Sequence, residues 1–190
     1  MNILCDTCSV LMLIRIAPKM FIDARFQCAT IKEVRREIFE RQKFKTKYQW
    51  RSQYRDKIIT IETLLQKNVF YKRTCILIDE MIFSGKLNES TARLFDLSFQ
   101  DRRVAAAAIS LKYDVSTTDT DLINFLKQEF EIKNKFPLNL VNEWLTNKLI
   151  CWDEKFQSII EDWNVFSEPP QPASTIKKFE QLSGYKYRGP

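Results

Sequence analysis

The fold is decided by residues 97–130, whose sequence is LSFQDRRVAAAAISLKYDVSTTDTDLINFLKQEF. Ser98 is a suitable N-cap for a helix that carries Asp101 in its first turn, and four consecutive alanines keep this helix slim enough to pack closely. Residues 115–118, which are rich in β-branched side chains, predict a short strand that delivers Asp119 at its carboxyl end, and a further helix follows it. Because helix and strand alternate, the sequence predicts an α/β fold with a mainly parallel sheet.

A similar strand is predicted near the first residue. Residues 3–6, ILCD, indicate a buried strand that ends in Asp6, and the apolar residues of 9–21 indicate a helix after it. Functional sites in open parallel sheets lie beyond the carboxyl ends of the strands. We therefore expect Asp6 and Asp119 at the same edge of the sheet.

A further acid is expected on a helix between these strands. Thr30 and Glu33 have the spacing of a capping box, which predicts that the helix begins at Thr30. Glu37 then lies one turn beyond Glu33 on the same side of the helix. Taken one at a time, such acids fit turn chemistry, a favourable helix dipole or ordinary surface charge.

The length of the chain suits one domain with appendages. We predict an α/β domain over residues 1–135, with a basic, aromatic and helical insertion at about 41–74. Residues 136–166 are predicted to be a helical extension of the same domain. Residues 167–190 are predicted to be a Pro-rich linker and a basic, mobile tail.

The amino-acid composition excludes several classes of catalytic and binding site. The net charge of +6 favours a polyanionic partner, although an acidic protein or a membrane surface also attracts such a charge. The chain has no histidine, which excludes serine–histidine and cysteine–histidine nucleophiles, and its three glycines cannot form a Gly-rich phosphate loop. Neither a secretory signal nor a membrane span is expected, and an odd number of scattered cysteines suits a reducing, cytoplasmic location.

The sequence CDTC at residues 5–8 is formally a C-x-x-C motif. Such a pair after a strand is found in thioredoxin-like redox sites and in half of a zinc site. A zinc site needs a second close cysteine pair or a histidine, and the other three cysteines stand alone. We favour two apolar cysteines on either side of a functional Asp6.

The order and spacing of the acidic motifs resemble the PIN-domain family, which includes the VapC-type toxin ribonucleases. The motifs are ILCD followed by Thr7 and Ser9, the V-x-x-E of EVRREI, LSFQDRRVAAAA and STTDTDL, so the resemblance covers about residues 1–135. It implies a three-layer α/β/α fold with a short, mainly parallel central sheet, here with additional C-terminal helices. It also implies a catalytic quartet around Mg²⁺ or Mn²⁺, which falls on Asp6, Glu37, Asp101 and Asp119.

Residue roles follow from the resemblance. The expected metal ligands are Asp6, Asp101 and Asp119, and Asp121 is an alternative or additional ligand to Asp119. Glu37 is expected to orient or deprotonate the attacking water, with Glu33 as a near alternative. Supporting hydroxyl groups are expected from Thr7, Ser9 and Thr118.

Substrate binding is assigned to basic and aromatic side chains. Lysine and arginine neutralise phosphates, and exposed aromatic rings stack on unpaired bases. The candidates for binding RNA are Arg102, Arg103, Lys45, Lys47, Tyr48, Trp50 and Arg51. The alternative is that the aromatic rings face inward and that one of the two arginines, Arg102 or Arg103, forms a structural ion pair.

The sequence thus predicts a Mg²⁺- or Mn²⁺-dependent endoribonuclease, a hydrolase acting on RNA and not associated with a membrane. The resemblance adds the role of a toxin, with an antitoxin protein and a second copy of the chain as partners. Three alternatives stay open: a non-catalytic nucleic-acid-binding module of PIN fold, a DNA-directed nuclease, and a redox protein using Cys5 and Cys8.

Overall fold

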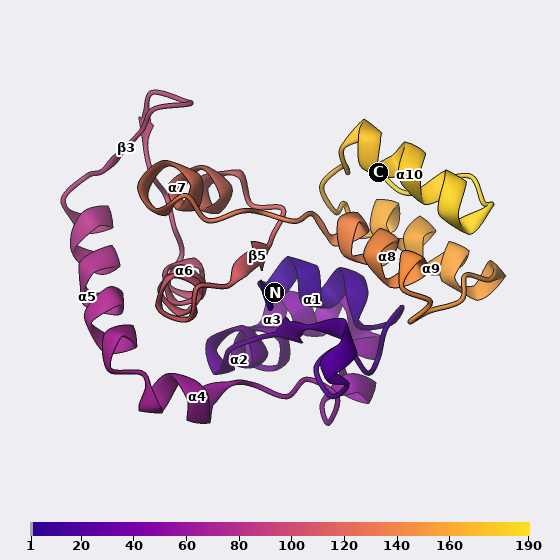
Figure 1. Cartoon of the computed structure of the whole chain (residues 1–190), viewed down its shortest axis with the longest axis horizontal. Coiled ribbons are helices and arrows are strands. Elements are labelled where there is room, and N and C mark those ends of the chain that lie inside the picture. Colours follow the sequence, from indigo (N-terminus) through magenta and orange to yellow (C-terminus); the bar gives the residue numbers. More distant parts are fainter. Residues whose placement is uncertain (1) are drawn as a thin grey trace.

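A computed structural model describes residues 2–190 of the chain (Figure 1). At its centre is a parallel sheet in the order β2–β1–β5, formed by Cys28–Ala29, Ile3–Cys5 and Asp114–Ser116. In the register of this sheet Leu4 pairs with Ala29 on one side and with Val115 on the other. The predicted mixed α/β fold with a parallel sheet is confirmed.

Within the described residues, ten α-helices and two 3₁₀ helices surround the sheet. Those before β5 are α1 (Thr7–Leu13), η1 (Ala24–Phe26), α2 (Lys32–Glu40), α3 (Gln42–Lys47), η2 (Gln49–Tyr54), α4 (Glu62–Lys67), α5 (Val69–Phe83) and α6 (Phe99–Leu111). Those after it are α7 (Thr120–Phe130), α8 (Pro137–Thr146), α9 (Glu154–Val165) and α10 (Ala173–Ser183). An antiparallel hairpin of β3 (Leu87–Asn88) and β4 (Arg93–Leu94) connects α5 to α6.

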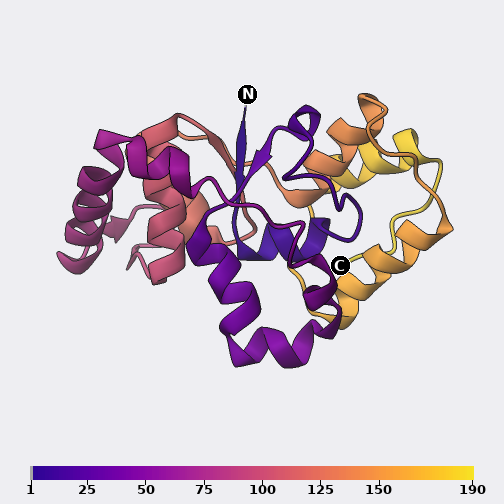
Figure 2. The same ribbon diagram turned by 90° about the horizontal axis from the view of Figure 1, so that it is seen from below.

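The sheet lies between two groups of helices. Helices α5, α6 and α7 lie at one end of the molecule and α8, α9 and α10 at the other, in both Figure 1 and Figure 2. Helices α1 and α6 pack against β1, and α2 packs against both of them. This arrangement is compatible with a three-layer α/β/α fold.

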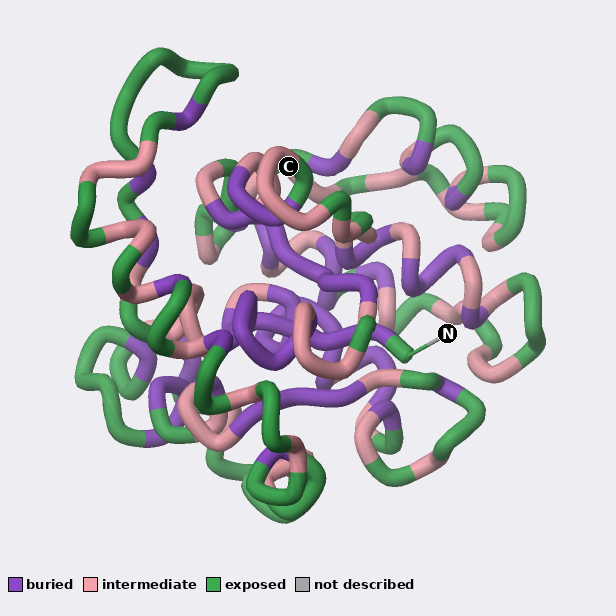
Figure 3. The backbone as a smooth tube through the Cα atoms, turned by 60° about the vertical axis from the view of Figure 1, so that its left-hand side comes forward, coloured by how far each residue is buried: buried purple, intermediate pink, exposed green. Residues whose placement is uncertain are grey.

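The core is centred on β1 and α6, and buried backbone gathers in the middle of the molecule (Figure 3). The predicted slim helix is confirmed, because Ala105, Ala106, Ala107 and Ala108 are fully buried between neighbouring elements. Ser98 caps α6 as predicted, and a full capping box with Asp101 is present. Helix α6 ends at Leu111, and its C-cap residue Lys112 adopts a left-handed backbone conformation.

The predicted helix start at Thr30 is wrong. Helix α2 begins after Ile31, which makes no side-chain cap. The Thr30 hydroxyl instead donates to the backbone carbonyl of Cys5, 3.0 Å away, and so joins the two adjacent strands β1 and β2. Because this buried hydroxyl satisfies a carbonyl at the end of β1, it contributes more there than at an exposed helix end.

The predicted mobile tail is also corrected. Residues 173–183 form α10, which packs against α8 and buries Phe179 completely. The linker before it is held as well, because the Gln171 side chain accepts a hydrogen bond from the Leu138 amide at 3.1 Å. The C-terminal segment therefore belongs to the folded body. Among the described residues, no helix is both long and apolar enough to cross a membrane.

Candidate functional site

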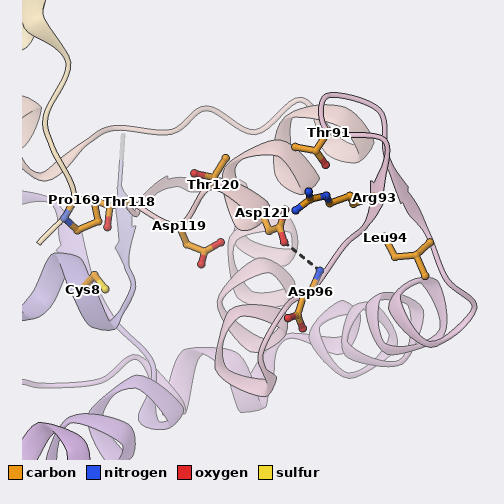
Figure 4. A pocket seen from close by; sticks show the side chains of 10 residues that line it. All are labelled: Cys8, Thr91, Arg93, Leu94, Asp96, Thr118, Asp119, Thr120, Asp121 and Pro169. Carbon is orange, nitrogen blue, oxygen red and sulfur yellow. Dashed lines mark hydrogen bonds between the residues drawn. The ribbon is translucent and has the colours of Figure 1, made fainter. Parts of the chain in front are cut away.

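A pocket of about 910 Å³ opens beyond the carboxyl ends of β1 and β5 (Figure 4). One side is formed by Thr118 and Asp119 of the connection from β5 to α7 and by Asp121 in the first turn of α7. The opposite side is formed by the hairpin and the segment after it. Cys8 of α1 and Pro169 of the loop before α10 close the end of the pocket.

Asp6 lies deep in the molecule at the start of α1. Its carboxylate caps this helix by accepting the Ser9 amide at 2.7 Å, and it also accepts the Thr117 hydroxyl at 2.6 Å. Burial raises the pKa of Asp6 to about 7, and the negative charge of Asp101 adds to this rise. The hydrogen bonds from Thr117 and Ser9 act against it. Asp6 therefore changes its charge near neutral pH.

Asp101 occupies the third position of α6. Its carboxylate accepts the Ser98 hydroxyl at 2.5 Å and the Ser98 amide at 3.1 Å. Burial raises the pKa of Asp101, and the charges of Asp119 and Glu37 raise it further, while the hydrogen bonds from Ser98 lower it. The capping box thus fixes the side chain in a site where other carboxylates disfavour its charged form.

Asp119 and Glu37 complete the group. Asp119 is exposed to the pocket and caps α7 by accepting the Leu122 amide at 2.8 Å. Glu37 is buried on α2, accepts the Thr7 hydroxyl at 2.5 Å and forms an ion pair with Arg41. The charges of Asp119 and Glu37 raise the pKa of Asp101, and the charge of Asp101 raises the pKa of Asp6. These pairwise interactions link all four predicted acids into one electrostatic cluster.

Asp121 is used differently. One of its carboxylate oxygens accepts the Asn88 side-chain amide at 3.0 Å, and the other accepts the Asp96 backbone amide at 3.3 Å (Figure 4). Both partners belong to the hairpin region. Asp121 therefore ties the hairpin to α7, whereas the neighbouring Asp119 carries the interaction with the acidic cluster.

The hydroxyl groups divide between two tasks. Thr7 donates to Glu37 as a supporting residue, and Thr118 lines the pocket. The Ser9 hydroxyl accepts from Ser116 of β5 at 3.1 Å, so its side chain joins α1 to the sheet while its amide serves Asp6. Thr117 was missed by sequence analysis, although STTD offers two threonines that point to opposite sides of an extended chain and only one could face Asp6.

The four acids have the right ligand type for a divalent metal ion, but their positions do not form a metal site. The four side chains offer carboxylate oxygens, which are the ligands that Mg²⁺ and Mn²⁺ prefer, and the raised pKa values of Asp6 and Asp101 mark carboxylates whose charged form a cation would stabilise. However, no three Asp, Glu or Cys side chains among residues 2–190 converge so as to hold a metal ion. The donor set fits a hard divalent cation in kind, and ligation requires the side chains to close further.

The predicted stacking residues face inward. Tyr48 is buried and donates its hydroxyl to Glu168, and Trp50 packs against Tyr48 and Tyr54 with the Arg15 guanidinium 5.2 Å from its ring centre. These rings extend the core, as the alternative interpretation held. The predicted base stacking by Tyr48 is therefore wrong.

Most of the predicted cationic residues are also engaged. Arg102 and Arg103 share Asp79 of α5, the first at 2.7 Å, and the Arg51 guanidinium donates to the Ile38 carbonyl at 2.9 Å. Lys47 lies 3.9 Å from the buried Glu168. Lys45 is exposed on α3. Arg102, Arg103 and Arg51 are thus bonded within the protein and are not free to bind a phosphate.

The cysteines give no support to a C-x-x-C redox pair. All five thiols lie within the described residues and are free. Cys5 is buried and interacts with Cys28 of the adjacent strand, and this contact, together with burial, raises its pKa well above the usual value. Burial also raises the pKa of Cys8. Neither thiol is activated as a nucleophile, because only the thiolate is reactive.

Comparison with known proteins finds no matching family model, no similar curated protein and no similar solved structure.

Proposed function

We propose that this chain is a metal-dependent endoribonuclease of PIN-like fold, which hydrolyses RNA phosphodiester bonds at the acidic cluster. The observation that supports the proposal is that four carboxylates from four separate elements interact electrostatically near the carboxyl edge of a parallel sheet, where burial and neighbouring negative charge raise the pKa of Asp6 and Asp101. Uncompensated buried charge costs stability, so such clusters are kept where a cation or a reaction uses them.

The residues divide the work according to their partners. Asp6, Asp101 and Asp119 each keep oxygen lone pairs beyond the hydrogen bonds described above, and they would hold Mg²⁺ or Mn²⁺. When bound, such a cation supplies an acidified water and neutralises charge on the phosphate. Glu37 is held by Thr7 and Arg41, so it is better suited to orient water by accepting a hydrogen bond than to move toward a metal.

A specific observation supports one alternative. Because no metal-holding group is formed among residues 2–190 and Glu37 is already neutralised by Arg41, a nucleic-acid-binding module without catalysis is the second candidate. DNA as the substrate is a variant of the first proposal, since carboxylates do not sense the 2′-hydroxyl. The toxin role, the antitoxin and the homodimer are proposals that rest on the sequence resemblance alone.

The test is cleavage of a mixed set of labelled single-stranded and structured RNAs by the purified chain with Mg²⁺, Mn²⁺ or EDTA. Asp6→Asn and Asp101→Asn are compared with Asp56→Asn, which removes the same charge at an exposed position after η2. We expect metal-dependent cutting that both site variants lose and the control keeps. RNA binding without cutting under any metal would favour the binding module, and matched DNA oligonucleotides decide between the two nucleic acids.

A further inference from the structure

The hairpin of β3 and β4 forms one wall of the pocket, and of the four clustered acids Asp119 lines the pocket. Thr91, Arg93 and Leu94 line the pocket from this side, and Asp119 and Asp121 line it from the other (Figure 4). The tip of the hairpin is exposed from Glu89 to Leu94. The hairpin therefore faces whatever enters the pocket and contributes little to the core.

The base of this hairpin is fixed to α7. Asn88 is fully buried and donates to Asp121 at 3.0 Å, and the Gln128 side chain accepts the Glu89 amide and donates to the Leu87 carbonyl, both at 3.0 Å. Lys86 forms an ion pair with Glu129 of α7 at 2.9 Å. These contacts hold the pocket-facing residues at a set distance from the acidic edge, although their own side chains are exposed.

The segment that follows β4 is held against α7 by an aromatic contact of Phe95. The Phe95 ring packs edge-on against Phe125 of α7, with ring centres 5.3 Å apart. Because both ends of the hairpin are attached to the same helix, the backbone that carries Arg93 is held in place. A supported side chain loses less conformational freedom on binding a ligand than one on a free loop.

Arg93 is the only cationic residue that lines this pocket among the described residues. Figure 4 shows its guanidinium pointing into the pocket beside Asp121. It forms no ion pair within 4.0 Å among residues 2–190, unlike Arg102 and Arg103, which share Asp79. Its planar group of five donors is suited to bind a phosphate through two hydrogen bonds at once.

We propose that Arg93 is a positioning residue that binds a backbone phosphate of single-stranded nucleic acid beside the acidic cluster, so that the next phosphodiester lies over Asp101 and Asp119. This inference rests on the proposed nuclease function. The competing explanation is that Arg93 only neutralises the carboxylates of Asp96 and Asp121. The two differ in salt dependence, because a phosphate contact releases counterions from the nucleic acid and an internal charge contact does not.

The test measures binding of a labelled single-stranded RNA over a range of salt concentrations with Mg²⁺, in the Asp101→Asn background to prevent cutting. Arg93→Gln is compared with Arg73→Gln, which removes an exposed arginine of α5 outside the pocket. We expect Arg93→Gln to bind about tenfold more weakly at low salt and to lose about 0.7 from the slope of log Kd against log salt. Arg73→Gln should match the parent.

Cleavage by the chain with Asp101 intact separates this inference from the proposed function. There, Arg93→Gln should raise KM and leave kcat nearly unchanged, and Arg93→Lys should restore part of the salt slope without the tight binding. An unchanged salt slope in Arg93→Gln, or the absence of RNA binding by the parent, would overturn the role of Arg93. If Arg93→Gln loses the expected part of the slope of log Kd against log salt but the parent never cuts RNA, the nuclease proposal is refuted and Arg93 remains a phosphate-binding residue.

Discussion

Replacing Asp6 by Asn should reverse its effect on stability between acid and alkaline pH in the metal-free protein. The pKa of Asp6 is about 7 in the folded chain against 3.8 for an ordinary aspartate, so the folded state binds a proton that the unfolded state has released. The carboxyl therefore costs almost nothing below pH 3.8, and its cost rises with pH until the folded pKa is passed. A difference of one pH unit between the folded and unfolded pKa is worth about 1.4 kcal/mol.

With these values, ionised Asp6 destabilises the fold by about 0.5 kcal/mol at pH 4 and by about 4 kcal/mol at pH 8. The introduced asparagine carries no charge, but its amide group faces donors from Thr117 and Ser9 and loses one of two hydrogen bonds, which costs about 1 kcal/mol. Asp6→Asn should thus be slightly less stable than the parent at pH 4 and more stable by about 3 kcal/mol at pH 8.

Urea unfolding in EDTA, followed by tryptophan fluorescence at both pH values, measures this difference. Asp56→Asn serves as the control, because it makes the same substitution at an exposed position away from the acidic cluster. Addition of Mg²⁺ at pH 8 should stabilise the parent more than Asp6→Asn, since a bound cation removes the penalty on the charged form. If the difference in free energy of unfolding between the parent and Asp6→Asn is the same at pH 4 and pH 8, Asp6 is not a buried carboxyl with a raised pKa.

Other changes have effects that follow from single contacts. Ser98→Ala removes the capping box that holds Asp101 and should cost about 1 kcal/mol in thermal unfolding; cleavage should fall as well, and Ser98→Thr should recover both. Tyr48→Phe leaves the buried Glu168 carboxylate without its donor, so we expect about 1–3 kcal/mol less stability in urea but no change in RNA affinity. A drop in affinity at constant stability would instead mean that the Tyr48 hydroxyl contacts RNA. Phe179→Ala should cost about 3–5 kcal/mol, and a loss below about 1 kcal/mol in a melting experiment would mean that α10 is not packed in solution.

Local signals predicted the elements that hold the acids. The strand at ILC, the Ser98 cap with Asp101 and the run of four alanines were all found as expected, because each depends on neighbours within a few residues. The placement of Asp6 and Asp119 at one edge followed from a general rule on parallel sheets. Periodicity and capping were therefore sufficient for the framework around the pocket.

Features that depend on distant partners were not predicted. Thr30 has the sequence pattern of a helix cap, but its hydroxyl serves a carbonyl of β1, and Tyr48 has the pattern of an exposed basic segment, but its partner is Glu168. The tail is polar and basic, yet Phe179 fills a space between α8 and its neighbours. In each case one long-range contact outweighs the local preference, and a single sequence does not name that contact.

The presence of both Cys8 and Pro169 in one pocket has a consequence for the order in which the protein matures. Pro169 is added to the growing chain roughly ten to thirty seconds after Cys8 at typical synthesis rates. Glu37, Asp101 and Asp119 are translated during that interval, before the end of the pocket that Pro169 closes exists. The pocket therefore reaches its complete form only after the loop that carries Pro169 has been synthesised and lies beside Cys8.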